Sequence, residues 1–165
     1  MKILNGARPF GSTRVVGLGA VLGLLVSLVA ASAWAAEGET IGSIKTLQGQ
    51  AAVVRTPHIL PVEIGLKLVK TDVIKTGPNC SVGIILRDDT LLSLGPNSEL
   101  LLADFVFAPA EGKLSLVTRL TQGTAAYLSG QIGKLAPHAV RFETPVATIG
   151  TRGTMFAVKV DAPRP

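Results

Sequence analysis

The feature that most constrains the fold is a regular alternation of short apolar runs with turn residues along residues 41–160. Glycine, proline, asparagine or aspartate interrupts the apolar runs about every eight to twelve residues. Outside the N-terminal 35 residues, no window keeps a helical period over the roughly ten residues that a helix requires. Short strands at this spacing are typical of sandwiches, barrels and solenoids. The sequence therefore predicts an all-β domain.

The expected strands follow the apolar runs, and the turn residues separate them. They cover residues 41–47, 51–55, 62–68, 73–75, 80–86, 90–94, 99–107, 114–120, 124–128, 140–142, 146–149 and 155–160. Two turns, at Gly77-Pro78-Asn79 and Gly95-Pro96-Asn97, repeat the same three residues. A repeat of this kind suits the coils of a solenoid, which usually shows three or more repeats. Two architectures stay open: a β-solenoid-like domain and a twisted β-sandwich of short strands.

The N-terminus has the organisation of a secretory signal peptide. Its basic residues, which no acidic residue offsets, are Lys2, Arg8 and Arg14. An apolar run follows over residues 15–31, and Ala33 and Ala35 then form the small-x-small pattern of a cleavage site. We expect residues 1–35 to be removed and residues 36–165 to form one domain in the periplasm. The alternative is an uncleaved anchor, because the run approaches the length of a membrane span.

Charge excludes a nucleic-acid partner. The formal net charge of +5 includes three basic residues of the N-terminal segment, so 13 Lys and Arg remain against 11 Asp and Glu, a net charge of +2. Binding to a phosphate backbone requires clustered basic residues on one face. The basic residues here are scattered singly along the chain. Membrane contact is expected only through the signal peptide.

Residues that could carry chemistry are few and isolated. Cys80 is the single cysteine, so it forms no intramolecular disulfide, and it is expected at the start of a strand, with an intermolecular disulfide as the alternative. Two histidines, His58 and His138, are too few for a zinc site, which uses three or four ligands. Adjacent Asp88 and Asp89 are ordinary hairpin residues. We expect no metal, no cofactor and no enzymatic activity.

Two further groups of residues allow alternative roles. Phe105, Phe107 and Tyr127 pack in the core or offer rings on which a sugar stacks. The segment Gly150-Thr151-Arg152-Gly153-Thr154 is either a tight turn between two strands or an anion cradle built from backbone N–H groups and one guanidinium.

An ordered series of motifs extends over about residues 41–160. Gly65 and Leu68 precede Asp72-Val73-Ile74-Lys75-Thr76-Gly77, and the hairpin Asp88-Asp89-Thr90 precedes Leu92-Ser93-Leu94-Gly95-Pro96-Asn97-Ser98-Glu99-Leu100. Gly123 follows, and the series closes with Thr144-Pro145 through Phe156. In this order the motifs resemble the FecR domain, an all-β extracytoplasmic module named after an iron-dicitrate regulator.

The resemblance implies a binding or regulatory module that acts in the cell envelope by protein-protein recognition, with an unidentified envelope protein as partner. The alternative is a module that binds peptidoglycan or another glycan. Only fourteen residues precede the apolar run, whereas the sigma regulators of the family carry a helical cytoplasmic segment, so we expect no direct contact with a sigma factor. The family motif residues with structural or binding roles are Gly77, Gly95, Asn97, Thr144, Pro145, Gly150, Arg152, Gly153 and Thr154.

Overall fold

The computed structural model describes residues 38–150 and 155–161 of the chain. The expected signal peptide with Ala33 and Ala35 lies outside the described residues, as do Arg152, Gly153 and Thr154. The strands are β1 (Thr40–Gln48), β2 (Ala51–Arg55), β3 (His58–Pro61), β4 (Lys67–Val69), β5 (Val73–Thr76), β6 (Ser81–Leu86), β7 (Leu91–Leu94), β8 (Glu99–Ala108), β9 (Lys113–Leu128), β10 (Val140–Glu143), β11 (Thr148–Gly150) and β12 (Met155–Val160). Helix α1 spans Gln131–Leu135, and 3-10 turns lie at Pro109–Glu111 and Pro137–Ala139.

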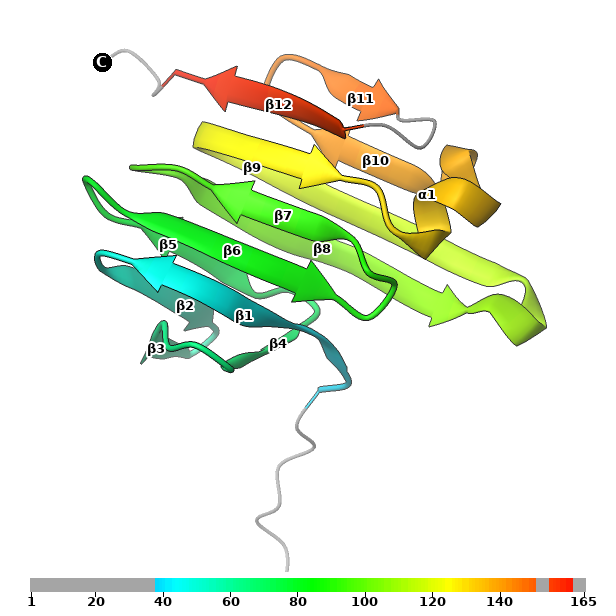
Figure 1. Cartoon of the computed structure of the whole chain (residues 1–165), viewed down its shortest axis with the longest axis horizontal. Helices are drawn as coiled ribbons and strands as arrows, with labels where there is room; N and C mark the ends of the chain where they lie inside the picture. The colour runs from blue at the N-terminus through cyan, green and yellow to red at the C-terminus, as the bar shows by residue number, and fades with distance from the viewer. Residues whose placement is uncertain (1–37, 151–154, 162–165) are drawn as a thin grey trace, which may run out of the picture. The chain divides into compact units, whose positions relative to one another are not determined.

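These strands form one sheet that curls into two layers, like half of a barrel (Figure 1). The front layer contains β4, β1, β6, β7, the second half of β9, and β12. The back layer contains β3, β2, β5, β8, the first half of β9, β10 and β11. Strand β9 belongs to both layers because residues 113–122 pair with β8 and residues 123–128 pair with β12. Among the described strand pairs, only that of β9 with β10 is parallel.

The core lies between the two layers and follows the alternation of the sequence. In β6, Val82, Ile84 and Leu86 are buried, and the residues between them are partly exposed. Successive side chains of a strand point to opposite faces, so one apolar residue in two reaches the interior. The same pattern in β7 and β8 contributes leucines from both layers to a single core.

The chain passes between the layers at one edge of the molecule through four stacked turns, here called the crossing turns. They lie at Gly49, between β1 and β2; at 77–79, between β5 and β6; at 95–97, between β7 and β8; and at Gly123, within β9. Backbone hydrogen bonds join neighbouring turns: Gly77 N–H donates to Gln50 O at 2.9 Å, and Asn97 N–H donates to Gly77 O at 3.1 Å. The crossing turns therefore hold the two layers in register along this edge.

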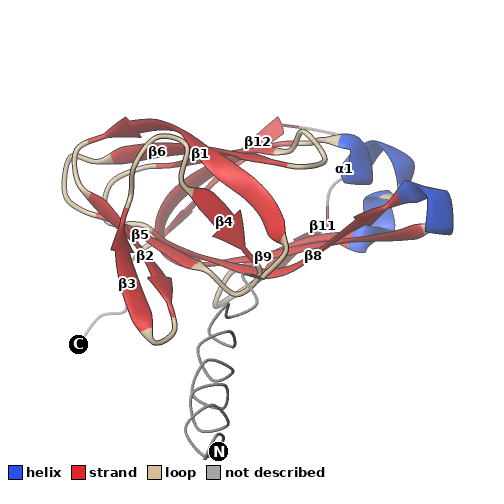
Figure 2. Cartoon of the chain, turned by 90° about the horizontal axis from the view of Figure 1, so that it is seen from below, coloured by secondary structure: helices blue, strands red, loops and turns tan. Residues whose placement is uncertain are grey.

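The opposite edge is covered by α1, which lies between the layers in the view of Figure 2. Its Ile132 is fully buried in the core. The hairpin between β6 and β7 anchors the first turn of the helix: Gln131 N–H donates to Asp88 O at 2.6 Å, and Ile132 N–H donates to the Asp88 carboxylate at 3.2 Å. Thr90 also donates its hydroxyl to that carboxylate at 2.7 Å, so the buried Asp88 is satisfied by hydrogen bonds.

The all-β expectation is confirmed, and the two open architectures resolve into a curled antiparallel sheet. Antiparallel pairing distinguishes it from stacked parallel coils, although the crossing turns do repeat. The strand predicted over 62–68 is wrong, because β3 ends at Pro61 and β4 begins at Lys67. Gly123 does not divide two strands, since β9 continues through it. Helix α1 was not predicted because five residues are too few to show a helical period.

Candidate recognition site at the open end of the sheet

Family motif residues at positions 77, 95 and 97 belong to the crossing turns. Asn97 has a φ of 49°, a left-handed conformation that asparagine tolerates better than most residues. Gly95 lies against the next crossing turn, where a Cβ would come within 2.1 Å of the Thr124 hydroxyl. Gly77 connects two turns through the hydrogen bonds given above. All three residues therefore have a structural role in the turns that hold the two layers together.

A buried pair of hydroxyl side chains supports these turns. Thr76 Oγ1 donates to Gly95 O at 2.7 Å and accepts a hydrogen bond from Ser98 N–H at 2.8 Å. Ser98 Oγ accepts from Thr124 N–H at 2.9 Å and lies 3.0 Å from Thr124 O. The two hydroxyls thus satisfy the hydrogen-bonding capacity of backbone N–H and C=O groups that have no strand partner in the turns. Thr76 and Ser98 were quoted within the motifs, but their contacts were not predicted.

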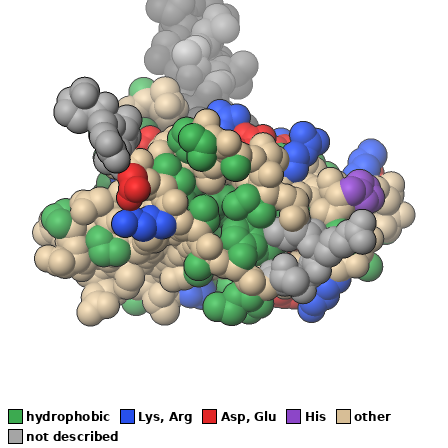
Figure 3. Space-filling model, turned by 90° about the horizontal axis from the view of Figure 1, so that it is seen from above, with side chains coloured by type: hydrophobic (Ala, Val, Ile, Leu, Met, Phe, Trp, Pro, Cys, Tyr) green, Lys and Arg blue, Asp and Glu red, His purple; other side chains and the backbone are tan. Residues whose placement is uncertain are grey.

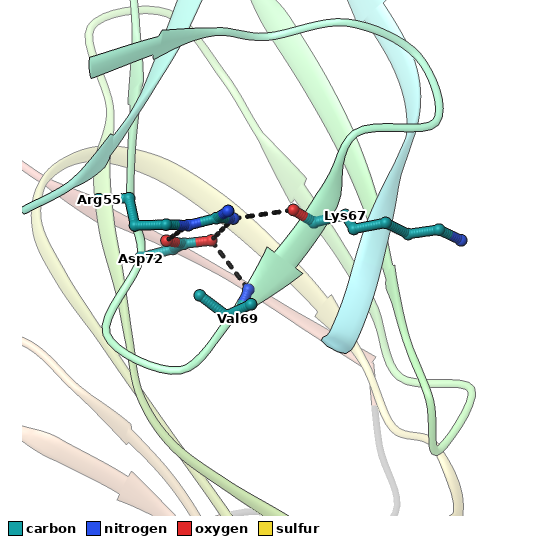
Figure 4. Close-up of polar contacts among 4 residues, drawn as sticks. All are labelled: Arg55, Lys67, Val69 and Asp72. Carbon is teal, nitrogen blue, oxygen red and sulfur yellow. Dashed lines mark hydrogen bonds and ion pairs between the residues drawn. The ribbon is translucent and has the colours of Figure 1, made fainter. Parts of the chain in front are cut away.

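An ion pair closes the end of the curled sheet at β3 and β4 (Figure 4). Arg55, on β2 in the back layer, donates through Nε and Nη2 to the two carboxylate oxygens of Asp72, both at 2.8 Å. Arg55 Nη2 also lies 2.9 Å from Lys67 O, and Val69 N–H donates to Asp72 Oδ2 at 2.9 Å. Lys67 and Val69 lie on β4, so the cluster joins back layer to front layer. Asp72 is fully buried.

The opposite end of the curled sheet, between β11 and β12, has no such closure among the described residues. Among the described strands, β11 pairs only with β10 and β12 only with β9, so each layer ends here in an edge that no described strand covers. Between the edges lies a groove of about 780 Å³, which we call the edge groove. It is lined by Thr121, Thr144, Pro145, Val146, Ala147, Ile149, Val158, Lys159, Val160 and Asp161. Figure 3 looks onto this end and shows hydrophobic side chains gathered near its middle.

Two of the predicted motif residues line the edge groove, and a third, Gly150, ends the strand β11 that borders it. Thr144 and Pro145 line it and begin the hairpin between β10 and β11. Thr144 Oγ1 accepts a hydrogen bond from Ala147 N–H at 3.0 Å, which stabilises this turn. Val146 at the tip of the hairpin is 91% exposed. Gly150 ends β11, opposite Arg141 of β10, immediately before residues 151–154, which lie outside the described residues.

The residues with reactive side chains do not assemble into a site. Cys80 is buried, and within the described ranges no three His, Cys, Asp or Glu residues lie close enough together to bind a metal ion. Hydrogen bonds from Lys70, first, and from Ser115 lower the pKa of Asp104, a partly exposed side chain. Asp104, Lys70 and Ser115 form a small cluster at the surface, with Lys70 Nζ and Ser115 Oγ each 2.7 Å from the carboxylate.

The aromatic residues belong mainly to the interior. Tyr127 is 1% and Phe105 is 5% exposed, and Phe107 is partly buried against the core. The ring of Tyr127 stacks on the ring of Phe156 with centroids 5.1 Å apart. Phe142 meets the ring of Phe156 edge-on. Core packing, one of the two predicted roles, is therefore the one that Tyr127 and Phe105 have. Their rings are not accessible for stacking on a sugar.

A search for helices that could span a membrane finds none among the described residues. The fold and the edge groove define a β domain whose frame is built from stacked turns and which leaves one end of its core open. A sequence model of the family described as FecR protein matches residues 72–164, more than half of the chain. The chain therefore belongs to the FecR family. No curated protein and no solved structure gives a significant match to it.

Proposed function

We propose that this protein is a periplasmic recognition module that contributes to signal transduction in the cell envelope by binding another envelope protein at the edge groove. The FecR family is generally linked to regulation in the envelope, which supports the setting. The observation that carries the proposal is the open end of the core. An exposed apolar opening of this kind is typical of an interaction site, since monomeric proteins rarely leave a large contiguous apolar patch uncovered.

The chemistry of the edge groove favours binding over catalysis. Its lining is mainly aliphatic, and the polar side chains in it are threonines, Lys159 and Asp161. Lys159 and Asp161 form an exposed ion pair with each other at 3.3 Å. Neither a histidine nor a cysteine is among the described lining residues, so the groove offers no activated nucleophile of the Ser-His or Cys-His kind. We propose that the protein is not an enzyme and uses no cofactor.

The proposed compartment depends on the N-terminal segment. Its basic start, apolar run and Ala33-Trp34-Ala35 pattern support export and cleavage before residue 36. Fractionation of cells, with mass spectrometry of the mature N-terminus, tests this directly. Recovery of the intact leader in the cytosol would contradict the proposed address.

Site-specific photo-crosslinking in cells tests the recognition function. A photoreactive amino acid replaces Val146 at the edge groove or, as a control, Ile59 on β3, which is 72% exposed at the far end of the sheet. We expect a crosslinked band containing an envelope protein from position 146 and none of that partner from position 59. A pull-down on insoluble peptidoglycan serves as the second measurement. Specific retention on peptidoglycan without a crosslinked protein would overturn the proposal in favour of a glycan ligand.

A further inference from the structure

We infer that the occupant of the edge groove is an extended segment of the partner, which pairs as a strand with the free edge of β12 and inserts alternate apolar side chains between β11 and β12. This inference rests on the proposed function, because it names the class of partner at the same site. Three observations lead to it: the incomplete cover of the core, the unpaired backbone of β12, and the contrast with the closed end of the sheet.

The core is covered less well at the edge groove than elsewhere. Ile149 of β11 and Phe156, Val158 and Val160 of β12 pack against the core but stay partly exposed. Inward residues of the central strands, such as Leu92, are 1% exposed. These four side chains therefore form an apolar floor that one more layer of side chains would bury.

The outer edge of β12 has no strand partner in the part of the chain that the structure describes. The strand is six residues long and pairs with β9 over its whole length, from Met155 opposite Leu128 to Val160 opposite Gly123. Its second edge faces no described strand, so every second N–H and C=O group there lacks a strand partner. Edge strands of this length are ready templates for another strand unless the protein blunts them.

The edges at the other end of the sheet are blunted. Strand β4 is three residues long, and β3 is four residues long and ends in Pro61, which has no N–H to donate. Residues 62–66 cross between the two layers, with Gly65 N–H donating to Ile44 O at 2.9 Å. Arg55 and Asp72 complete the closure. At the groove end, β11 is also only three residues long, but β12 is six residues long and no described strand pairs with its outer edge, so β12 is the edge that is free for a partner.

A strand fits this opening better than a helix or a second copy of the chain. A helix keeps its hydrogen bonds within itself, so it would cover the apolar floor and leave the edge of β12 unpaired. A second copy would approach with an edge that is fixed to its own core, and it would not send side chains into a groove between the layers of the first. A single extended segment satisfies both the backbone edge and the apolar groove, as in β-strand addition.

The two faces of β12 specify the pattern of the partner segment. Its inward positions must be apolar because they meet Val158 and Val160 in the groove and Phe156 further along the same face of β12. Its outward positions lie beside Met155, Ala157 and Lys159, which are exposed. Lys159 lies 3.3 Å from Asp161 in an exposed ion pair, and an acidic residue of the partner opposite Lys159 would add a cross-strand charge pair, a favourable arrangement on one face of a sheet. We therefore expect a segment of about six residues that alternates apolar and polar residues and has an acid on its polar face.

Binding of synthetic peptides to the protein purified from cells that express the full chain tests this inference. The probe is a seven-residue peptide that alternates valine with threonine and glutamate, and its control has the same composition with the valines adjacent. Fluorescence anisotropy should detect binding of the alternating peptide alone. Hydrogen exchange should show new protection of amides in β12 and none in β3. Equal binding of the two peptides, or protection elsewhere only, would overturn the inference.

Two variants separate specific pairing from general stickiness. Val158→Thr keeps the shape of an inward side chain and adds a hydroxyl to the groove, and it should weaken peptide binding about fivefold to tenfold. Ile59→Thr, on β3 at the far end of the sheet, where Ile59 is 72% exposed, is the matched control and should leave binding unchanged. Lys159→Glu should weaken binding of the glutamate peptide and restore binding of a lysine peptide, a reversal that loss of folding cannot produce. Thermal melting checks that each variant is folded.

The outcomes distinguish this inference from the proposed function. If cells yield an envelope partner by crosslinking but β12 gains no protection, the function stands and the strand-pairing inference fails. If the alternating peptide binds but no envelope protein is captured, the groove is a strand site and the proposed function fails. Sedimentation gives the third outcome: a stable dimer that Val158→Thr dissociates would mean that a second copy occupies the edge, and the inference would be wrong.

Discussion

The ion pair between Arg55 and Asp72 allows a prediction in which the two single substitutions have unequal costs. Asp72 is fully buried, whereas the side chain of Arg55 is 31% exposed. Arg55→Ala leaves a buried carboxylate that keeps the hydrogen bond from Val69 N–H. Asp72→Ala leaves a guanidinium that reaches water and keeps its contact with Lys67 O. We expect Arg55→Ala to destabilise the fold more.

The magnitudes follow from what each substitution leaves behind. Removing one partner of a buried pair costs about 3–5 kcal/mol when the remaining charge stays buried, which applies to Arg55→Ala. Asp72→Ala leaves the Val69 N–H without its acceptor, at a cost of about 1–3 kcal/mol. The expected difference is therefore about 2 kcal/mol. Since domains of this kind are stable by about 5–15 kcal/mol, Arg55→Ala removes a large share of the total.

Urea denaturation followed by circular dichroism measures the difference. With a slope of about 2 kcal/mol per molar urea, Arg55→Ala should lower the midpoint by about 1.5–2.5 M and Asp72→Ala by about 0.5–1.5 M. The control is Lys75→Ala, which breaks an exposed pair with Glu99 at 3.0 Å and should cost less than about 1 kcal/mol. Equal costs for the two substitutions at the buried pair, or a larger cost for Asp72→Ala, would refute the reasoning from burial.

Three further predictions concern the frame of the fold. Gly123→Ala should lower the unfolding free energy measured in urea by more than about 2 kcal/mol, because a Cβ would lie 2.3 Å from Ser98 Cα in the facing turn and φ is +90°. The control is Gly112→Ala, at a φ of +66° with open space around it, which should cost only about 1 kcal/mol. The hydrogen bond from Lys70 lowers the pKa of Asp104 in the folded protein. This carboxylate therefore contributes stability that is complete above its ordinary pKa of 3.8 and is lost as the pH falls through the lower folded-state pKa. The difference in unfolding free energy between wild type and Asp104→Asn should be below about 1 kcal/mol at neutral pH and should vanish in thermal melts at acid pH. Tyr127→Phe should leave the melting temperature unchanged or raise it, since the buried hydroxyl has no hydrogen-bond partner among the described residues, and a clear fall would disprove that account.

Local features of the fold were predictable from the sequence, because short-range physics determines them. The alternation in 80–86 predicted β6, and the predicted turns at 77–79 and 95–97 are present, with Asn79 and Asn97 in the left-handed backbone conformation that asparagine tolerates. Strand β8 was predicted in place and one residue too short, whereas β9 was predicted as two strands, 114–120 and 124–128, separated at Gly123. The segment 62–68 misled because its alternating apolar residues serve a crossing between layers, where Val62 is buried without being in a strand.

Features that depend on distant residues could not be predicted. Arg55 and Asp72 are 17 positions apart, and nothing in the local pattern indicates that they meet. The sequence indicated only a hairpin role for Asp88, yet its carboxylate accepts a hydrogen bond from Ile132 N–H in the first turn of α1, 44 positions away. The edge groove could not be predicted for the same reason. Whether β12 is a central strand or an edge strand depends on how all the other strands pair, which its local sequence does not indicate. Val146 and Val158 carry no signal in the sequence that distinguishes them from core residues.

The position of the family motifs bears on what family membership can predict. Gly77, Gly95 and Asn97 lie in the crossing turns, at the edge of the molecule where the layers are joined, and Thr76 and Ser98 saturate those same turns. A match to the motifs around Gly77, Gly95 and Asn97 therefore indicates that a chain can form the crossing turns that join the two layers. The edge groove instead takes its apolar surface from aliphatic positions in β11, β12 and the hairpin tip, where one aliphatic residue can replace another without disturbing the turns. If the edge groove binds a partner segment, as proposed above, exchange of the residues at 146, 149, 158 and 160 between two family members that share the frame should exchange their partners.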